Sequence, residues 1–230
     1  MITLITYEAG FGQPSFSPFC VKAMWLLQAA DAQWQREDSN DPRKFPQAKL
    51  PAIRVPEGII GDSHNIQIYL EERGADFWGA VTDKASGHAF IRMAEEHMYF
   101  HLVLDRWAND QLWPIIRENY FAAIPKLLRR PITSSIRKET LRGMKAQGLG
   151  RLTPEERLKR IAPDLAAIKA RLDAHPYLMG PEISLPDYSV AAMLCAMMAT
   201  PLPTLLQERI TDDPVLSAYA MRVAERMTPA

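Results

Sequence analysis

The chain has 230 residues, of which 47% are hydrophobic, and its 27 lysines and arginines are balanced by 27 aspartates and glutamates. This length allows one or two packed domains, and the balanced charge provides no net field that would draw the whole molecule to nucleic acid or an anionic membrane. The two cysteines, Cys20 and Cys195, lie far apart in helix-like sequence, which excludes a disulfide framework and favours a reducing compartment. We therefore expect a cytoplasmic protein.

The first element is an apolar, β-prone stretch over residues 2–7, followed by a connection rich in Gly and Pro. Ser17 is a favourable helix N-cap because its hydroxyl can accept from the free N–H groups of the first turn, and Pro18 suits the first helical position. This order places a hydroxyl, the Cys20 thiol and the positive end of a helix at the edge of a sheet. An anion such as a thiolate would be stabilised there.

Short β-prone runs continue through the first third of the chain. Residues 32–37 predict a short strand, and the runs 52–55 and 59–60 predict a hairpin. A helix then begins at residues 62–63 and ends near Gly74. Strand signals vanish beyond about residue 77, so we predict a domain boundary near residues 79–83. The sequence thus divides into an α/β domain over residues 1–78 and an all-helical domain over residues 84–230.

Helical periods dominate the second part. We expect helices over residues 84–107 and 112–128, a further helix start at Pro131 and a last helix over residues 213–227. Capping boxes at residues 153–156 and 184–187 begin two more helices. The second box precedes a stretch that is apolar on all sides, which predicts a central helix.

The order of these segments is similar to that of the cytosolic glutathione S-transferase superfamily, in which a thioredoxin-like domain precedes an all-α domain. The motifs that carry the resemblance are Leu50-Pro51, Asp62-Ser63 with the apolar residues after them, and the capping box at 184–187. Residues 14–22 and 148–156 further resemble the failed-axon-connections and metaxin-like branch, some of whose members are not known chiefly as enzymes. The resemblance implies a homodimer.

The resemblance also implies that glutathione is a co-substrate whose thiol must ionise near neutral pH. Ser17 occupies the position where related proteins carry the catalytic Ser or Cys, Tyr7 lies where other classes carry a catalytic Tyr, and Ser15 is a third hydroxyl in the same loop. Cys20 matches the second cysteine of a thioredoxin-like Cys-x-x-Cys motif whose first cysteine is replaced, so a two-cysteine disulfide cycle is unavailable. A buried structural role is favoured for Cys20 over a mixed disulfide with glutathione.

Five further residues are assigned to glutathione binding by the resemblance. Pro51 corresponds to the family's cis-proline, and Leu50 before it would pair with the cysteinyl unit through its backbone. Asp62 and Ser63 would hold the γ-glutamyl ammonium and carboxylate at a helix start, although an ordinary N-cap also explains them. Lys49 could reach the glycyl carboxylate, and a solvated lysine is equally consistent with the sequence.

Two other patterns are read as non-functional. His97 and His101 have the spacing of metal ligands, but Met98 replaces the glutamate of the His-Glu-x-x-His zinc signature, so we expect no metal. Residues 126–151 contain eight basic residues and one acid, Glu139, without a nucleic-acid-binding motif, and are read as a solvated face.

These observations predict a glutathione transferase that conjugates the glutathione thiolate to a hydrophobic, electrophilic small molecule, as in detoxification. Two alternatives remain open. One is a non-catalytic binding or scaffold protein that keeps the fold, and the other is a glutathione-dependent reductase or peroxidase that acts through Cys20.

Overall fold

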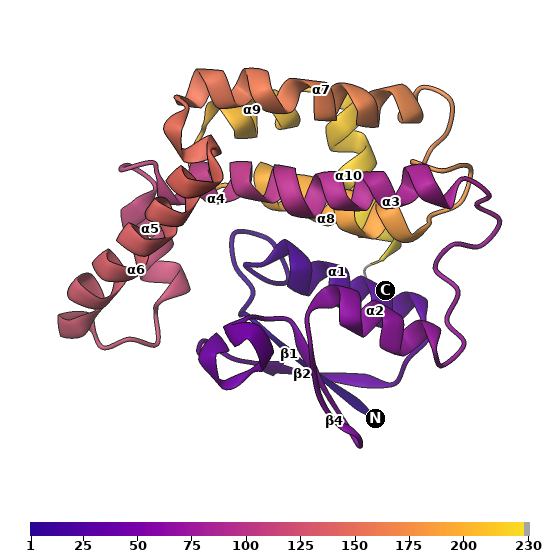
Figure 1. Cartoon of the computed structure of the whole chain (residues 1–230), viewed down its shortest axis with the longest axis horizontal. Coiled ribbons are helices and arrows are strands. Elements are labelled where there is room, and N and C mark those ends of the chain that lie inside the picture. Colours follow the sequence, from indigo (N-terminus) through magenta and orange to yellow (C-terminus); the bar gives the residue numbers. More distant parts are fainter. Residues whose placement is uncertain (228–230) are drawn as a thin grey trace.

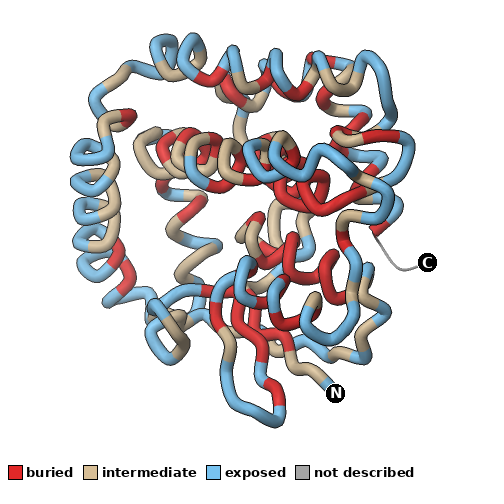
Figure 2. Tube along the Cα trace, turned by 45° about the vertical axis from the view of Figure 1, so that its right-hand side comes forward, coloured by how far each residue is buried: buried red, intermediate tan, exposed pale blue. Residues whose placement is uncertain are grey.

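Residues 1–227 are described by a computed structural model, in which a four-stranded sheet with two helices lies below a larger group of helices (Figure 1). Buried residues gather in the sheet and in the central helices, whereas the outer helices expose much of their surface (Figure 2). The predicted architecture, an α/β domain of thioredoxin-like type followed by a helical region, is confirmed.

The sheet is mixed, with the strand order β2-β1-β3-β4. Its strands are β1 (Ile2–Thr6), β2 (Trp34–Asp38), β3 (Ala52–Val55) and β4 (Gly58–Gly61). β1 and β2 are parallel because helix α1 (Pro18–Ala29) connects them, and β3 and β4 form the predicted antiparallel hairpin. Ile5 of β1 lies opposite Ala52 of β3, and Ala52 lies opposite Gly61 of β4, so the end of β1, the start of β3 and the end of β4 meet at one edge.

Two helices accompany the sheet. Helix α1 buries nine of its 12 residues, because it is covered by the sheet, by α2 (Ser63–Glu71) and by the central helix α8 (Leu185–Met198). Two short 3-10 turns, η1 (Pro42–Lys44) and η2 (Pro46–Ala48), fill the connection between β2 and β3.

The helical region begins after residues 72–83, which contain neither helix nor strand. Its remaining elements are α3 (Lys84–Met93), the π-helical turn η3 (Ala94–Met98), α4 (Tyr99–Trp107), α5 (Trp113–Tyr120), α6 (Lys126–Gln147), the 3-10 turn η4 (Leu149–Arg151), α7 (Pro154–Leu172), α9 (Leu205–Thr211) and α10 (Pro214–Arg226). The division into domains at 1–78 and 84–230 stays a prediction. No helix among residues 1–227 is both long enough and apolar enough to cross a bilayer.

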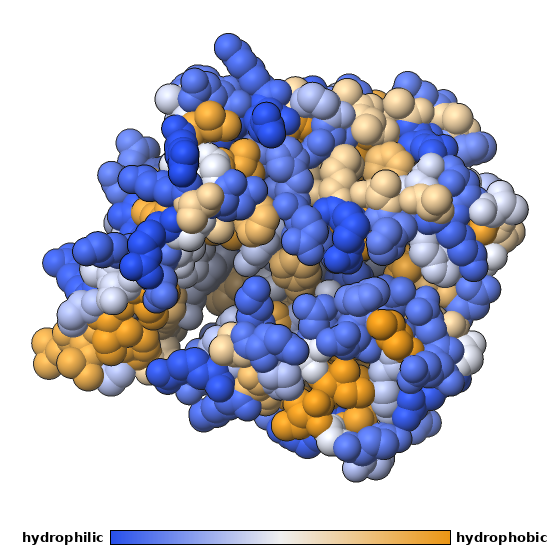
Figure 3. Space-filling model, in the orientation of Figure 1, coloured by the Kyte–Doolittle hydropathy of each residue, from blue (hydrophilic) through white to orange (hydrophobic). Residues whose placement is uncertain are grey.

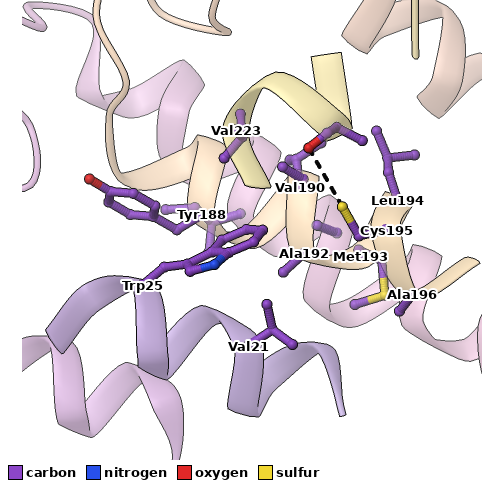
Figure 4. Packing of buried hydrophobic residues seen from close by; sticks show 14 of the residues in the cluster. Val21, Trp25, Tyr188, Val190, Ala192, Met193, Leu194, Cys195, Ala196 and Val223 are labelled. Carbon is purple, nitrogen blue, oxygen red and sulfur yellow. Dashed lines mark hydrogen bonds between the residues drawn. The ribbon is translucent and has the colours of Figure 1, made fainter. Parts of the chain in front are cut away.

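Helix α8 is central, as its sequence predicts, and 13 of its 14 residues are buried. Both predicted capping boxes form, and the Asp187 carboxylate accepts from the Ser184 N–H at 2.9 Å, the Leu178 N–H at 3.0 Å and the Tyr219 hydroxyl at 2.8 Å. In Figure 4, Trp25 of α1 points toward Tyr188 of α8. The N-terminal domain therefore packs directly on this helix.

The helix expected over 84–107 is confirmed as one continuous helical run, in which η3 is a π-helical turn between α3 and α4. Two other expectations about helices were wrong. The helix expected over 112–128, with Pro125 as its kink or end, is two helices separated by residues 121–125. Pro131 lies inside α6 and does not begin a helix. Its missing N–H frees the carbonyl of Leu127, a residue 94% exposed, so water can satisfy that carbonyl. Helix α9 was not expected.

A buried ion pair joins α1 to the helical region. The Lys22 ammonium lies 2.6 Å from the Glu95 carboxylate, and the two side chains are only 1% and 7% exposed. Glu95 also pairs with Arg92 and accepts from the Ser189 hydroxyl at 2.8 Å. Because Glu95 lies in η3, the π-helical turn carries the residue that compensates the buried cation of α1.

Replacing Glu95 with Gln should lower the free energy of unfolding by about 3–5 kcal/mol, because the Lys22 ammonium would stay buried without an anionic partner. Urea unfolding followed by tryptophan fluorescence measures this change. The matched control is Glu96→Gln, because Glu96 is 63% exposed and contacts Arg92 at 3.4 Å. That variant should lose less than about 1 kcal/mol, and equal losses in the two variants would contradict the role given to the Lys22–Glu95 pair.

Candidate active site

Ser17 is the N-cap of α1, as its sequence position predicts, and its hydroxyl accepts from the Cys20 N–H at 3.5 Å. The side chain is half-buried, and no carbonyl or carboxylate among the described residues accepts the hydroxyl proton. This hydroxyl therefore lies beside the positive end of α1, and a ligand would compete for its proton with the neutral Cys20 thiol, which is a weak acceptor.

Ser15 is placed differently. It is 2% exposed and its hydroxyl donates to the Tyr7 carbonyl at 3.0 Å. The Ser15 hydroxyl oxygen accepts two hydrogen bonds, from the Thr6 hydroxyl at 3.2 Å and from the Ser17 N–H at 3.3 Å. Arg36 adds hydrogen bonds to the Tyr7 carbonyl at 3.1 Å and the Pro14 carbonyl at 2.8 Å. Ser15 thus fixes the loop between β1 and α1, and its proton is already donated.

Tyr7 follows β1 and packs on the small apolar cluster that contains Cys20 and Leu50. Burial raises the pKa of Tyr7 well above its usual value, and the neighbouring Cys20 and Tyr99 raise it further. Tyr7 is therefore a neutral phenol at physiological pH. It can donate a hydrogen bond, but it does not act as a base.

Cys20 is completely buried. Burial raises the pKa of its thiol, and hydrogen bonds from the Thr6 side chain, the Tyr7 backbone and the Ser17 and Ser15 side chains offset this only in part. The thiol therefore stays protonated. Such a residue packs as a small hydrophobe, which supports the structural role expected for it over a reactive one.

Cys20 and Cys195 should both resist a thiol reagent in the native protein. Cys195 is buried in α8, where burial raises its pKa to about 12, and its thiol donates to the Ala220 carbonyl at 3.5 Å (Figure 4). Addition of an aromatic disulfide reagent should release no chromophore until the protein is unfolded in denaturant, when both thiols react. Prompt reaction of one thiol in the folded protein, lost in Cys20→Ala, would contradict the structural assignment of Cys20.

The Leu50–Pro51 peptide bond is cis, as the resemblance implies. Leu50 is buried, yet its backbone N–H and C=O make no hydrogen bond within residues 1–227. The Pro51 carbonyl accepts from the Asp62 N–H at 3.0 Å, which joins this segment to the start of α2. Lys49 is exposed and forms no ion pair among the described residues. Leu50 therefore offers one backbone donor and one acceptor to an extended ligand.

Asp62 and Ser63 begin α2, and the ordinary N-cap that also explains these residues is present. One carboxylate oxygen of Asp62 accepts from the His64 N–H at 2.8 Å, and the backbone of Asp62 has a positive φ of 78°. Ser63 is the first residue of the helix and is 2% exposed. The other carboxylate oxygen of Asp62 makes no hydrogen bond within the described part of the chain, so it can accept from a ligand ammonium.

The fold brings the predicted binding residues to one edge of the sheet. Ser17 follows β1, Leu50 precedes β3 and Asp62 follows β4, and these strand ends are neighbours in the sheet. Two positive helix ends, those of α1 and α2, lie at this edge. A ligand with a thiol, an exposed backbone and a terminal carboxylate and ammonium would find a matching group at each position.

The sequence analysis missed the aromatic residues that face this edge from the helical region. Phe11 and Phe16 of the loop pack against Tyr120 at the end of α5, with ring centroids 6.2 and 4.7 Å away. Arg106 of α4 donates to the Tyr120 hydroxyl at 2.6 Å. The sequence offered one signal for this cluster, the basic residue Arg106 between apolar positions of a helix. The residues that Arg106 contacts lie in distant segments of the chain, so the sequence alone does not indicate them. Trp107 and Trp113 pack together in the core behind this cluster, at 5.3 Å.

No cluster of His, Cys, Asp or Glu suited to a metal occurs within residues 1–227. His97 is bonded to Asp164 through Nδ1, and its Nε2 lies 3.4 Å from Nε2 of His101. Burial, together with the neighbouring His97, lowers the pKa of His101 to about 3, so His101 is neutral at physiological pH.

Known proteins are similar to this chain in sequence. The family model described as "Glutathione S-transferase N-terminal domain" matches residues 18–113. The isoprene-epoxide–glutathione S-transferase of Rhodococcus sp. (strain AD45) is 27% identical over 238 residues, which cover 98% of this chain and 99% of that protein. Metaxin-1 of Sus scrofa is 22% identical over 237 residues, covering 98% of this chain and 75% of that protein.

Solved structures show the same fold. Glutathione transferase GSTFuA2 from Phanerochaete chrysosporium superposes with a TM-score of 0.65 at 16% identity, covering 100% of this chain and 99% of that one. A glutathione S-transferase from Methylobacillus flagellatus kt, solved with glutathione bound, superposes with a TM-score of 0.58 at 15% identity over the whole of both chains. Residues 18–113 thus match the glutathione S-transferase N-terminal domain, the whole chain is similar in sequence to a glutathione S-transferase, and its fold is that of this superfamily.

Proposed function

We propose that this protein is a glutathione transferase in which the Ser17 hydroxyl stabilises the glutathione thiolate, and the thiolate attacks a small apolar electrophile. The observation that carries the proposal is the position of this hydroxyl, which is half-buried at the N-terminus of α1. It donates to no carbonyl or carboxylate within residues 1–227. Ser15 differs, because it already donates to the Tyr7 carbonyl. Tyr7 can contribute a second, weaker hydrogen bond as a neutral phenol.

The remaining predicted residues would hold glutathione in this orientation. The backbone of Leu50, before the cis bond to Pro51, would pair with the cysteinyl unit. The free oxygen of Asp62 would accept from the γ-glutamyl ammonium, and the start of α2 at Ser63 would bind the γ-glutamyl carboxylate. The exposed Lys49 ammonium would reach the glycyl carboxylate. The protein thus supplies an ionised nucleophile and its orientation.

The electrophile would bind between this edge and the helical region. Figure 3 shows the surface hollowed between the N-terminal domain and the part of the molecule that carries α5 and α6. Phe11, Phe16 and Tyr120 contribute aromatic surface near the loop that carries Ser17. Because the relative from Rhodococcus acts on an isoprene epoxide by its name, we include epoxides among the electrophiles of this protein. A cytoplasmic homodimer with a role in detoxification is part of the same proposal.

A non-catalytic binding protein is the second candidate, and two observations favour it. Metaxin-1 is similar over nearly the whole chain. Helix α6 also leaves apolar side chains exposed, with Leu127 94% and Leu128 54% exposed, on a surface that a partner could cover. A reductase or peroxidase acting through Cys20 is disfavoured because this thiol is buried and its pKa is raised.

Glutathione should bind saturably to the purified protein in a calorimetric titration, with one site per chain. Asp62→Asn should weaken this binding about tenfold, because it removes the negative charge opposite the ligand ammonium. Asparagine is an equally good N-cap, so the melting temperature of the variant should be unchanged. A wild-type titration with no saturable heat would contradict both the transferase and a glutathione-binding scaffold.

Ser17→Ala should lower kcat/KM for glutathione conjugation of an aryl halide by about 10²–10³, the range found when one hydrogen-bond donor to a developing anion is removed. Loss of the N-cap alone should destabilise the protein by about 1 kcal/mol. The matched control is Ser135→Ala on the exposed face of α6, which should keep full activity. If Ser17→Ala conjugates as fast as the wild type, Ser17 is not the thiol-activating residue.

A further inference from the structure

Helices α5 and α6 form an arm that stands out from the rest of the molecule (Figure 1). Three large apolar side chains are exposed at the end of α6 that the turn over residues 121–125 joins to α5, with Leu127 94%, Leu128 54% and Ile132 41% exposed. Figure 3 shows hydrophobic surface gathered at this projecting end, at the lower left. Apolar side chains that gather on an exposed surface mark a place where another surface binds.

A buried arginine holds this end of the arm in place. Arg129 is 8% exposed, and its guanidinium donates to the carbonyls of Ala122 and Ile124 at 2.7 and 2.9 Å and to the Glu118 carboxylate. These bonds tie the start of α6 both to the turn and to α5. Because Arg129 faces inward, the two leucines that precede it are held on the outside of the helix.

The outer surface of α6 also carries cations that no carboxylate neutralises. Lys138 and Lys145 lie seven residues apart, on the helix face that carries Leu127. Four exposed cations of α6 form no ion pair within residues 1–227, namely Lys126, Arg130, Lys138 and Lys145. The apolar end of the arm is therefore flanked by free positive charge.

The neutral total charge of the chain conceals this local excess. Residues 126–151 hold eight of the 27 basic residues and one of the 27 acidic residues, which leaves 19 basic and 26 acidic residues in the rest of the chain. The arm is thus positive and the remainder negative. A symmetric contact between two copies of the arm would bring like charges together, whereas a surface with dense negative charge would attract it.

We propose that this arm docks the protein on an anionic lipid bilayer. Leu127 and Leu128 enter the boundary between headgroups and acyl chains, and the unpaired lysines and Arg130 lie against the anionic headgroups. The apolar side chains surround a projecting end rather than line a groove. A fluid bilayer accepts side chains in any direction, whereas a protein partner would need a matching cavity. The docking is peripheral, and it does not depend on the proposed transferase activity.

The test measures how much of the purified full-length chain sediments with lipid vesicles. Vesicles of phosphatidylcholine with about 30% phosphatidylglycerol are compared with vesicles of phosphatidylcholine alone. We expect the partition coefficient to be at least about tenfold higher on the anionic vesicles. It should fall as the salt concentration rises, because salt screens the attraction between the arm and the headgroups.

Two double variants separate the apolar from the electrostatic contribution. Leu127→Ser with Leu128→Ser should lower the partition coefficient on anionic vesicles by about tenfold or more, because two apolar side chains no longer leave water. Lys138→Gln with Lys145→Gln should lower it by about tenfold and make it less dependent on salt. All four side chains are exposed, so both variants should keep the melting temperature of the wild type.

The matched controls change exposed residues of the same kinds on other elements. Met221 is 52% exposed on α10, and Lys44 and Lys84 are exposed outside the arm. Met221→Ser and the double variant Lys44→Gln with Lys84→Gln should bind anionic vesicles within about twofold of the wild type. Losses as large as those of the arm variants would contradict docking through the arm.

A second measurement reports insertion directly. A polarity-sensitive fluorophore can be attached to Leu127→Cys alone, because Cys20 and Cys195 are buried. Its emission should shift to the blue when anionic vesicles are added, and the same label at Met221→Cys should show no shift.

Four results would overturn the inference: equal binding to both kinds of vesicle, binding to neither, undiminished binding in the leucine variant, or no blue shift at position 127. Sedimentation velocity covers the other occupant. A leucine variant that binds vesicles like the wild type but loses a self-association of the wild type would also overturn it, because the leucines would then join two copies of the chain.

Discussion

The burial of α1 is the constraint on which the rest of the structure depends. This helix lies between the sheet and α8, and nine of its 12 residues are buried. One of them is Lys22, whose charge must be compensated inside the protein. Glu95 provides that compensation from the π-helical turn of the helical region. The Lys22–Glu95 pair thus joins the two parts of the chain in addition to the apolar packing of α1 on α8, and its disruption would leave a charge buried without a partner.

This constraint also positions the candidate site. With α1 held on both sides, its N-terminus is fixed beside the ends of β1 and β3, and the Ser17 hydroxyl is fixed with it. The buried Ser15 hydroxyl and the Arg36 guanidinium hold the preceding loop through its backbone carbonyls. In the proposed reaction the Ser17 hydroxyl would therefore need little reorganisation when the thiolate forms, which is the condition under which a hydrogen-bond donor contributes most to catalysis.

Local sequence determined the parts of the fold that could be predicted. Ser17 and the capping box at Ser184 act within one helical turn, so their residues alone indicate where helices begin. Pro131 shows the limit of such arguments, because it lies inside α6, where an exposed carbonyl tolerates the missing N–H. The Arg106–Tyr120 pair could not be predicted either. Its cation bonds to residues 14 and 90 positions away, at Tyr120 and Ala196, which only the tertiary fold brings together.

The central claim is that the Ser17 hydroxyl stabilises an anionic sulfur at the N-terminus of α1. The most direct measurement is the pKa of protein-bound glutathione, followed by the ultraviolet absorbance of the thiolate as pH is varied. The wild type should hold this pKa at least about one unit below the value near 8.5 of an unperturbed thiol, and Ser17→Ala should return it toward that value. A bound thiol whose pKa is the same in both proteins, or no lower than that of free glutathione, would contradict the account.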